Sequence, residues 1–251
     1  MAAVSEFVAL DVSDGVATIR IDKPPTNALD TQVLDELRAA AAAAATDRAV
    51  AAVVFYGGEK FFAVGDDARE LAALTPGMLA DRHAALAAIA ELPKPTVAAI
   101  SGYAFDTGLE LALCTDRRIV GDNVKLSLGA IRQGLIPSGG AHVRLARLIG
   151  ASAAKDLIFT GRYVEADEAR ALGLVDEVVA PDDVYVAARR WAAQFEGAPA
   201  LALAAAKAAI EAADPSVERE RFATLLASRD AQSGLASYLA DGPNSARFTG
   251  E

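Results

Sequence analysis

The sequence contains few of the residues on which several kinds of active site depend. It has one cysteine, Cys114, and two histidines, His83 and His142, in 251 residues. A single cysteine excludes an internal disulfide and any cysteine-cluster metal site, and two histidines leave little material for a histidine triad or a histidine-rich metal centre. We therefore expect no metal ion, and we expect Cys114 to be a packed core thiol.

Basic residues are also few, since 24 Lys and Arg stand against 34 Asp and Glu, for a net charge of −10. This balance argues against nucleic acid or an anionic membrane as the main partner. No apolar run is long enough to cross a membrane, and the first residues lack the basic and apolar regions of a secretory signal. We expect a soluble, cytoplasmic protein.

Three common motifs are missing as well. The sequence has no Gly-x-Gly-x-x-Gly dinucleotide fingerprint, no P-loop and no Gly-x-Ser-x-Gly nucleophile elbow. These absences argue against a nicotinamide enzyme, a P-loop nucleotide hydrolase and a serine hydrolase.

Apolar runs that read as strands alternate with segments of helical periodicity, which predicts an α/β protein. The expected strands are 7–12, 16–21, 50–56, 96–100, 117–120, 125–128 and 174–179. The expected helices are 30–45, 66–74, 76–92, 107–114, 141–149, 152–159, 165–172, 184–195, 201–212, 216–228 and 233–240. Helices dominate the last third of the chain.

Two similar units stand out, each a buried strand followed by a small-residue turn and a short helix. The first covers 51–67 and the second 96–110. Backbone N–H groups at such turns can converge on one negative oxygen and stabilise it. Glu110 lies one turn into the second helix, in an otherwise apolar run. Because an unpaired buried carboxylate is costly, Glu110 either lies on an exposed face as a structural charge or is placed for chemistry. In the second case it would act as a general base beside this oxyanion hole.

Several blocks in the same order resemble the enoyl-CoA hydratase/isomerase (crotonase) superfamily. These are Pro-Thr-Asn-Ala-Leu at 25–29, Phe-Ala-Val-Gly-Asp-Asp at 62–67, the block from Lys94-Pro95 to Glu110, Gly-Leu-Ile-Pro-Ser-Gly-Gly at 134–140, the stretch 154–175 and Arg-Phe-Thr-Gly at 247–250. The resemblance covers nearly the whole chain.

The resemblance implies a crotonase-like spiral of ββα units over residues 1–195 and a C-terminal helical region over 196–251. That region would cover the pocket and build a homotrimer, or a homohexamer as a dimer of trimers. The implied substrate is a coenzyme A thioester, so coenzyme A arrives as part of the substrate and no separate cofactor is expected. The implied reaction is hydration of trans-2-enoyl-CoA, of the fatty-acid β-oxidation type.

The resemblance also implies roles for individual residues. The backbone N–H groups of Val64 and Thr107 match the family's oxyanion hole, and Glu110 matches its acid/base. Positions that match the family's substrate and coenzyme A contacts are Asn27, Ala28, Leu29, Ala63, Gly65, Asp66, Asp67, Gly108, Ala130 and Pro137.

Four positions depart from the family pattern. Asp106-Thr107 replaces two glycines, Asp66 replaces a small residue, and Ala130 stands where hydratases carry a second glutamate. For Asp106 we keep two interpretations, the missing second acid and a helix N-cap, and for Asp66 we expect a cap. Enoyl-CoA isomerisation or other enolate chemistry by Glu110 alone, and non-catalytic acyl-CoA binding, remain the alternatives to hydration.

Overall fold

The structure is a computed structural model, and it describes residues 5–242 and 246–251. Its main sheet has six strands in the order β1-β2-β3-β5-β7-β10. The first two strands form an antiparallel hairpin and the remaining pairs are parallel. The bounds are β1 Val8–Ser13, β2 Val16–Ile21, β3 Ala52–Tyr56, β5 Thr96–Ile100, β7 Arg117–Gly121 and β10 Glu177–Val179.

A second sheet of four short strands lies next to the first, in the order β4-β6-β8-β9. Its strands are β4 Phe61–Ala63, β6 Tyr103–Phe105, β8 Lys125–Ser127 and β9 Val164–Glu165. Each of β3, β5 and β7 in the main sheet is followed directly by β4, β6 or β8 in the second sheet. The chain thus repeats a unit in which one strand of the main sheet is followed by one strand of the second sheet. This repeat is the one expected of a crotonase-like spiral.

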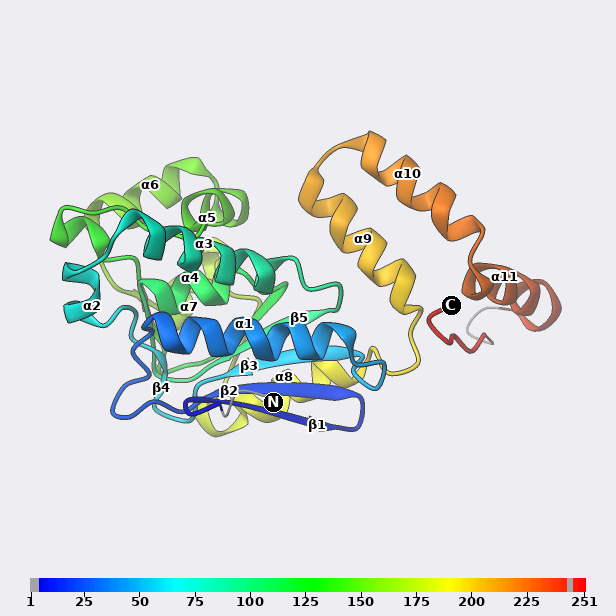
Figure 1. Cartoon of the computed structure of the whole chain (residues 1–251), viewed down its shortest axis with the longest axis horizontal. Coiled ribbons are helices and arrows are strands. Elements are labelled where there is room, and N and C mark those ends of the chain that lie inside the picture. Colours follow the sequence, from blue (N-terminus) through cyan, green and yellow to red (C-terminus); the bar gives the residue numbers. More distant parts are fainter. Residues whose placement is uncertain (1–4, 243–245) are drawn as a thin grey trace.

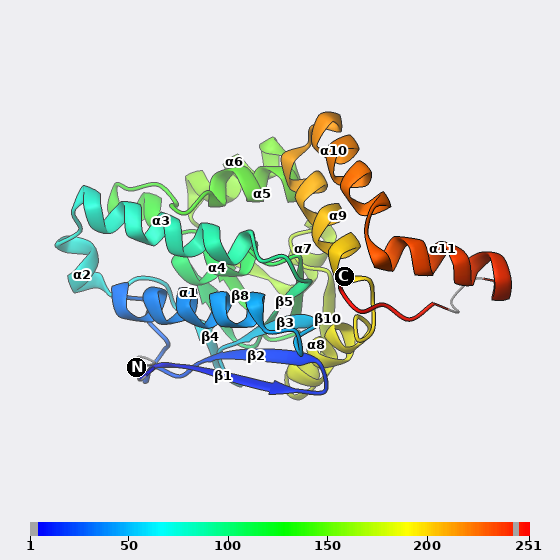
Figure 2. The same ribbon diagram turned by 45° about the vertical axis from the view of Figure 1, so that its right-hand side comes forward.

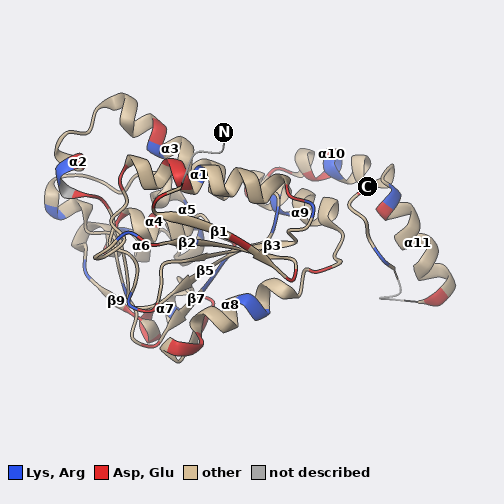
Figure 3. Ribbon diagram, turned by 60° about the horizontal axis from the view of Figure 1, so that its bottom comes forward, with Lys and Arg blue, Asp and Glu red and all other residues tan. Residues whose placement is uncertain are grey.

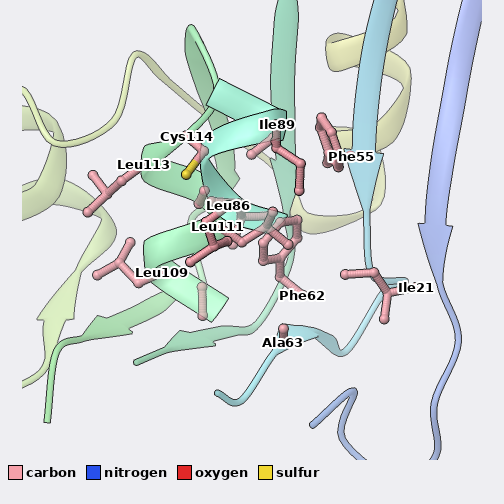
Figure 4. Packing of buried hydrophobic residues seen from close by; sticks show 14 of the residues in the cluster. Ile21, Phe55, Phe62, Ala63, Leu86, Ile89, Leu109, Leu111, Leu113 and Cys114 are labelled. Atoms are coloured by element: carbon pink, nitrogen blue, oxygen red, sulfur yellow. The ribbon is translucent and has the colours of Figure 1, made fainter. Parts of the chain in front are cut away.

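Both faces of the main sheet are buried at its central strands β3 and β5, which explains why these two strands are apolar runs. In β3, Val53 and Phe55 pack into the larger core, whereas Ala52 and Val54 pack on the opposite face against α8. The larger core holds Leu86, Leu109 and Leu111 together with Phe62 and Ile21 (Figure 4). Its helices are α1 Thr31–Thr46, α3 Pro76–Ala90, α4 Thr107–Leu113, α5 Ala141–Ile149, α6 Ala151–Thr160 and α7 Ala166–Leu172, and α8 is Val184–Ala193.

The last three helices project from this core (Figures 1 and 2). They are α9 Ala200–Ala212, α10 Pro215–Leu226 and α11 Arg229–Asp241, and neither α9 nor α10 buries a residue. Large apolar side chains on them are exposed, including Ile210 at 76% and Leu239 at 83%. The division at residues 195 and 196 stays a prediction, as do the trimer and the hexamer.

The prediction missed several short elements. β4, β6 and β9 have two or three residues, too few to show a period, and a 3-10 turn covers Ala130–Gln133. Two expected bounds were wrong: the strand expected at 174–179 begins at Glu177, and the last helix begins at Arg229, four residues earlier than expected. A second 3-10 turn, Pro181–Asp183, precedes α8, and α2 covers Ala68–Ala72.

Charged residues are spread over many elements in the view of Figure 3, with Lys and Arg on α2, α8 and α10 among others. In the described part of the chain, no helix combines the length and the apolar character needed to span a membrane.

Candidate active site

The two strand-turn-helix units recognised in the sequence lie side by side. β4 pairs in parallel with β6, so the turn after Ala63 meets the start of α4. A side chain at Gly108 would overlap the carbonyl oxygen of Ala63, and a Cβ at Gly65 would lie 2.8 Å from the carbonyl oxygen of Phe105. Glycine at these two positions therefore permits the close approach of the two turns.

Glu110 is buried, with 3% of its surface exposed, and both of its carboxylate oxygens accept hydrogen bonds from one residue. The backbone N–H of Ser138 donates to Oε1 at 2.6 Å, and the Ser138 hydroxyl donates to Oε2 at 2.8 Å. Burial raises the pKa of Glu110, whereas the Ser138 donors and the nearby Arg82 charge act in the opposite direction. A carboxyl with a raised pKa can take and return a proton near neutral pH.

Glu110 borders a cavity of about 320 Å³. Much of its wall is apolar, formed by Leu71, Leu74, Leu79, Leu135, Ile136 and Pro137. Its polar lining includes Asp66, Arg82 and Asp106, and Ala130 also contributes to it. A cavity of about 350 Å³ shares Asp66 and Asp106 with the first and is lined by Val64. The two cavities are therefore adjacent, one beside Val64 of the first turn and the other beside Glu110, the expected acid/base.

Asp106 is not the helix cap that one interpretation expected. Its backbone has φ 45° and ψ −120°, a conformation that favours glycine, and its side chain makes no capping hydrogen bond. Instead, Oδ1 accepts a hydrogen bond from the backbone N–H of Gly129 at 2.6 Å. Burial raises the pKa of Asp106, against the lowering effect of the N–H groups of Gly129 and Ala130. A second carboxyl therefore lies beside Ala130, the position that lacks the family's second glutamate.

Asp66 does not cap a helix either, because α2 begins two residues later and Asp67 accepts the capping bonds from Arg69 and Glu70. Asp66 instead forms an ion pair with Arg82 and accepts a hydrogen bond from the Thr107 hydroxyl at 2.7 Å. The sequence analysis overlooked Arg82, which is one basic residue in an ordinary helix. No motif marked it as buried.

The two expected oxyanion donors differ in their surroundings. Thr107 is the first residue of α4, so its N–H has no partner within the helix. The N–H of Val64 donates weakly to the carbonyl oxygen of Thr26, at 3.3 Å. A thioester oxygen at Val64 would have to compete with that carbonyl group.

Asn27, Ala28 and Leu29 were expected to contact the substrate. In the structure, Asn27 and Leu29 make hydrogen bonds to the backbone around the first turn. The Asn27 side-chain NH2 donates to the carbonyl oxygen of Gly57 at 2.6 Å and to that of Phe62 at 3.2 Å, and its Oδ1 accepts from Lys23. Leu29 is a core residue whose N–H donates to Gly65, and Ala28 is half-buried. Asn27 and Leu29 therefore position the turn, and Ala63 is buried within it.

Three further residues have defined surroundings. His83 accepts a hydrogen bond from the N–H of Gly139 at 3.3 Å, and His142 lies in the first turn of α5, as expected. Cys114 is buried, which confirms it as a core thiol. Within residues 5–242 and 246–251, no three His, Cys, Asp or Glu side chains are grouped so as to hold a metal ion.

A larger cavity of about 410 Å³ lies between the core and α9, with Cys114, Arg144 and Lys207 in its wall. It includes neither Glu110 nor either of the turns. We therefore take the cavities at Glu110 as the candidate active site.

Comparisons with known proteins agree with this fold. The family model described as enoyl-CoA hydratase/isomerase matches residues 11–241. A Mycobacterium avium protein named probable enoyl-CoA hydratase EchA17 is 50% identical over 233 residues, which cover 89% of this chain and 90% of that protein. A Mycobacterium tuberculosis protein of the same name is 49% identical over 230 residues, 88% of each chain.

Solved structures give the same result. The crystal structure of an enoyl-CoA hydratase from Bacillus anthracis matches with a TM-score of 0.89 and 27% identity, over 98% of this chain and 100% of that one. An enoyl-CoA hydratase from a Polaromonas species matches with a TM-score of 0.86 and 26% identity, over 96% and 99%. The chain belongs to the enoyl-CoA hydratase/isomerase family of enzymes, in the crotonase superfamily.

Proposed function

We propose that this enzyme adds water to the double bond of trans-2-enoyl-CoA thioesters and that Glu110 is its acid/base. The observation that carries the proposal is the Glu110 carboxylate, buried at the wall of an apolar cavity and oriented by two Ser138 donors. The family membership and the relatives named as probable enoyl-CoA hydratases support the same reaction.

In the proposed reaction, Glu110 removes a proton from water while the water oxygen bonds to C3 of the acyl chain. The electron pair of the double bond moves through C2 onto the thioester oxygen, which the N–H groups of Val64 and Thr107 hold. Losing one such donor costs about 3–4 kcal/mol in comparable oxyanion holes. The enolate then takes a proton at C2, and the product is a 3-hydroxyacyl-CoA.

Asp106 is the proposed donor of that second proton. Its carboxyl borders the same cavity as Glu110, and burial raises its pKa, which is the direction that a proton donor needs. After the C2 proton is delivered, the proton on Glu110 returns to Asp106 through solvent. Asp106 thus takes the role that a glutamate at position 130 has in the family pattern.

One observation favours a second candidate function. Ala130 provides no acid, so Glu110 alone would suffice for moving a double bond by removing and returning a proton. In that case the enzyme would convert 3-enoyl-CoA to 2-enoyl-CoA. A non-catalytic acyl-CoA binding protein would also retain the cavity.

The test follows the absorbance of the enoyl thioester after purified protein is mixed with crotonyl-CoA and longer trans-2-enoyl-CoAs. We expect the absorbance to fall, and we expect Glu110→Gln to slow this by about 10²–10⁴-fold, the usual contribution of a general base. Glu91→Gln, which alters an exposed carboxylate at the end of α3, is the matched control and should keep the parental rate.

The outcomes separate the candidates. Absorbance gained from a 3-enoyl-CoA, with none lost from 2-enoyl-CoAs, would replace hydration by isomerisation. Binding of acyl-CoA without either change would leave the non-catalytic function.

A further inference from the structure

The cavity beside Glu110 has one buried cation in its wall, Arg82, and the proposed reaction does not use it. Arg82 extends from α3 into the space between that helix and the oxyanion turns, and 3% of its side chain is exposed. Its Nη2 pairs with Asp66 and donates to the Thr107 hydroxyl at 3.0 Å. Its Nη1 is buried and meets no acceptor among the described residues.

An unpaired buried guanidinium N–H group is unusual, because buried donors nearly always find an acceptor. Asp66 and Thr107 both bond to Nη2, so they leave Nη1 unpaired. Arg82 borders the cavity that also contains Glu110, so a molecule bound there lies beside the guanidinium.

A plain hydrocarbon chain has no acceptor atom, so it would leave Nη1 unpaired. An oxygen atom in the acyl chain would accept its hydrogen bond. The neighbouring groups indicate that this oxygen is neutral. Besides Arg82, the cavity is lined by three carboxyl groups, those of Asp66, Asp106 and Glu110, and by His83 and His142. A carboxylate in the acyl chain would meet the ionised members of this set at close range.

We propose that this enzyme selects thioesters whose acyl chain carries a neutral oxygen acceptor, such as an ether, a hydroxyl or a carbonyl group, beyond the double bond, and that Arg82 Nη1 donates to it. The proposal rests on the acyl-CoA function proposed above. It makes Arg82 a specificity-determining residue for the acyl group.

The test compares trans-2-heptenoyl-CoA with its 5-oxa and 6-oxa analogues, which replace one CH2 group by oxygen at nearly constant length. A fourth probe, trans-2-heptenedioyl-CoA, carries a terminal carboxylate. We expect kcat/KM for at least one oxa analogue to exceed that of the hydrocarbon about tenfold, as for one hydrogen bond to a charged group. The carboxylate probe should be the poorest of the four.

Arg82→Met keeps an unbranched side chain with the apolar part of arginine and removes the donors. The ratio of kcat/KM for the oxa analogue to that for the hydrocarbon should therefore fall to about one. Because this change leaves Asp66 without its ion pair, the double variant Arg82→Met/Asp66→Asn repeats the test with no unpaired charge. The control is Arg132→Met, which removes an exposed cation that does not line the cavity and should keep the parental preference.

Equal kcat/KM for heptenoyl-CoA and both oxa analogues would overturn the proposal, as would a preference that survives Arg82→Met or a best rate with the carboxylate probe. Absence of turnover with all four probes would instead contradict the hydratase function. Calorimetric binding of heptanoyl-CoA and its saturated oxa analogues then decides the proposal. Tighter oxa binding that Arg82→Met abolishes supports it, and equal binding overturns it.

Discussion

Ser138 holds both oxygens of Glu110, one through its backbone N–H and the other through its hydroxyl. Both donors favour the ionised carboxylate, while burial opposes it. Since a general base must be ionised, the Ser138 hydroxyl extends the pH range in which Glu110 can act.

Ser138→Ala should therefore raise the pKa of Glu110 and move the acid limb of the kcat/KM profile to higher pH. A hydrogen bond to a charged group contributes about 1.5–3 kcal/mol, which corresponds to a shift of about one to two pH units. The measurement is the pH profile of hydration by the two proteins. A limb that stays in place in Ser138→Ala would show that the hydroxyl does not act on Glu110.

The backbone at Asp106 predicts an effect on stability. At φ 45° and ψ −120°, a residue with a Cβ is strained by about 1–3 kcal/mol, and glycine is not. Asp106→Gly and Asp106→Ala both lose the bond to Gly129, so the difference between them isolates the strain. We expect Asp106→Gly to have the larger free energy of unfolding by about that amount, measured by urea denaturation. Equal values would contradict the strain.

Much of the fold could be predicted because its strands and helices carry strong local patterns. The central strands β3 and β5 are short apolar runs, and α4 begins at its expected residue, Thr107. Two aspartates were harder, because their roles depend on the exact start of each helix. Asp66 and Asp67 are adjacent, and only the structure shows that Asp67 makes the capping bonds.

Arg82 could not be predicted from its local sequence. It lies 28 positions before Glu110, in an alanine-rich helix, and its burial follows from the packing of α3 against α4. The Asp106–Gly129 bond is equally non-local, since it joins the start of α4 to the turn after β8. The motifs identified Ala130 as a departure from the family pattern. They carry no information on the distance in space between Ala130 and Asp106.

Cys114 should be unreactive in the native protein. Burial raises the pKa of its thiol to about 12, so the thiolate that reacts with alkylating agents is scarce at pH 8. We expect no labelling by iodoacetamide under native conditions and complete labelling in urea, read by intact mass spectrometry. Rapid native labelling would show that the core around α4 opens.

We expect the homotrimer or homohexamer to bury the apolar side chains that α9, α10 and α11 expose, because many exposed apolar side chains on one segment are typical of an interaction site. They include Ile210, Phe222, Leu226, Leu235, Tyr238 and Leu239. Light scattering after gel filtration should give the mass of three or six chains, and Leu239→Asp should lower it. Glu220→Gln, at an exposed polar position on α10, serves as the control. A parental mass of one chain would contradict the assembly.

The central claim is that Asp106 takes the place of the missing glutamate at position 130. The most direct measurement is kcat/KM for crotonyl-CoA hydration by the parent, by Asp106→Gly, and by Asp106→Gly/Ala130→Glu, which restores the family pattern at both positions. We predict that Asp106→Gly loses about 10²–10⁴-fold and that adding Ala130→Glu recovers a substantial part of the loss. Parental activity in Asp106→Gly would contradict the claim, because hydration would then proceed without the Asp106 carboxyl.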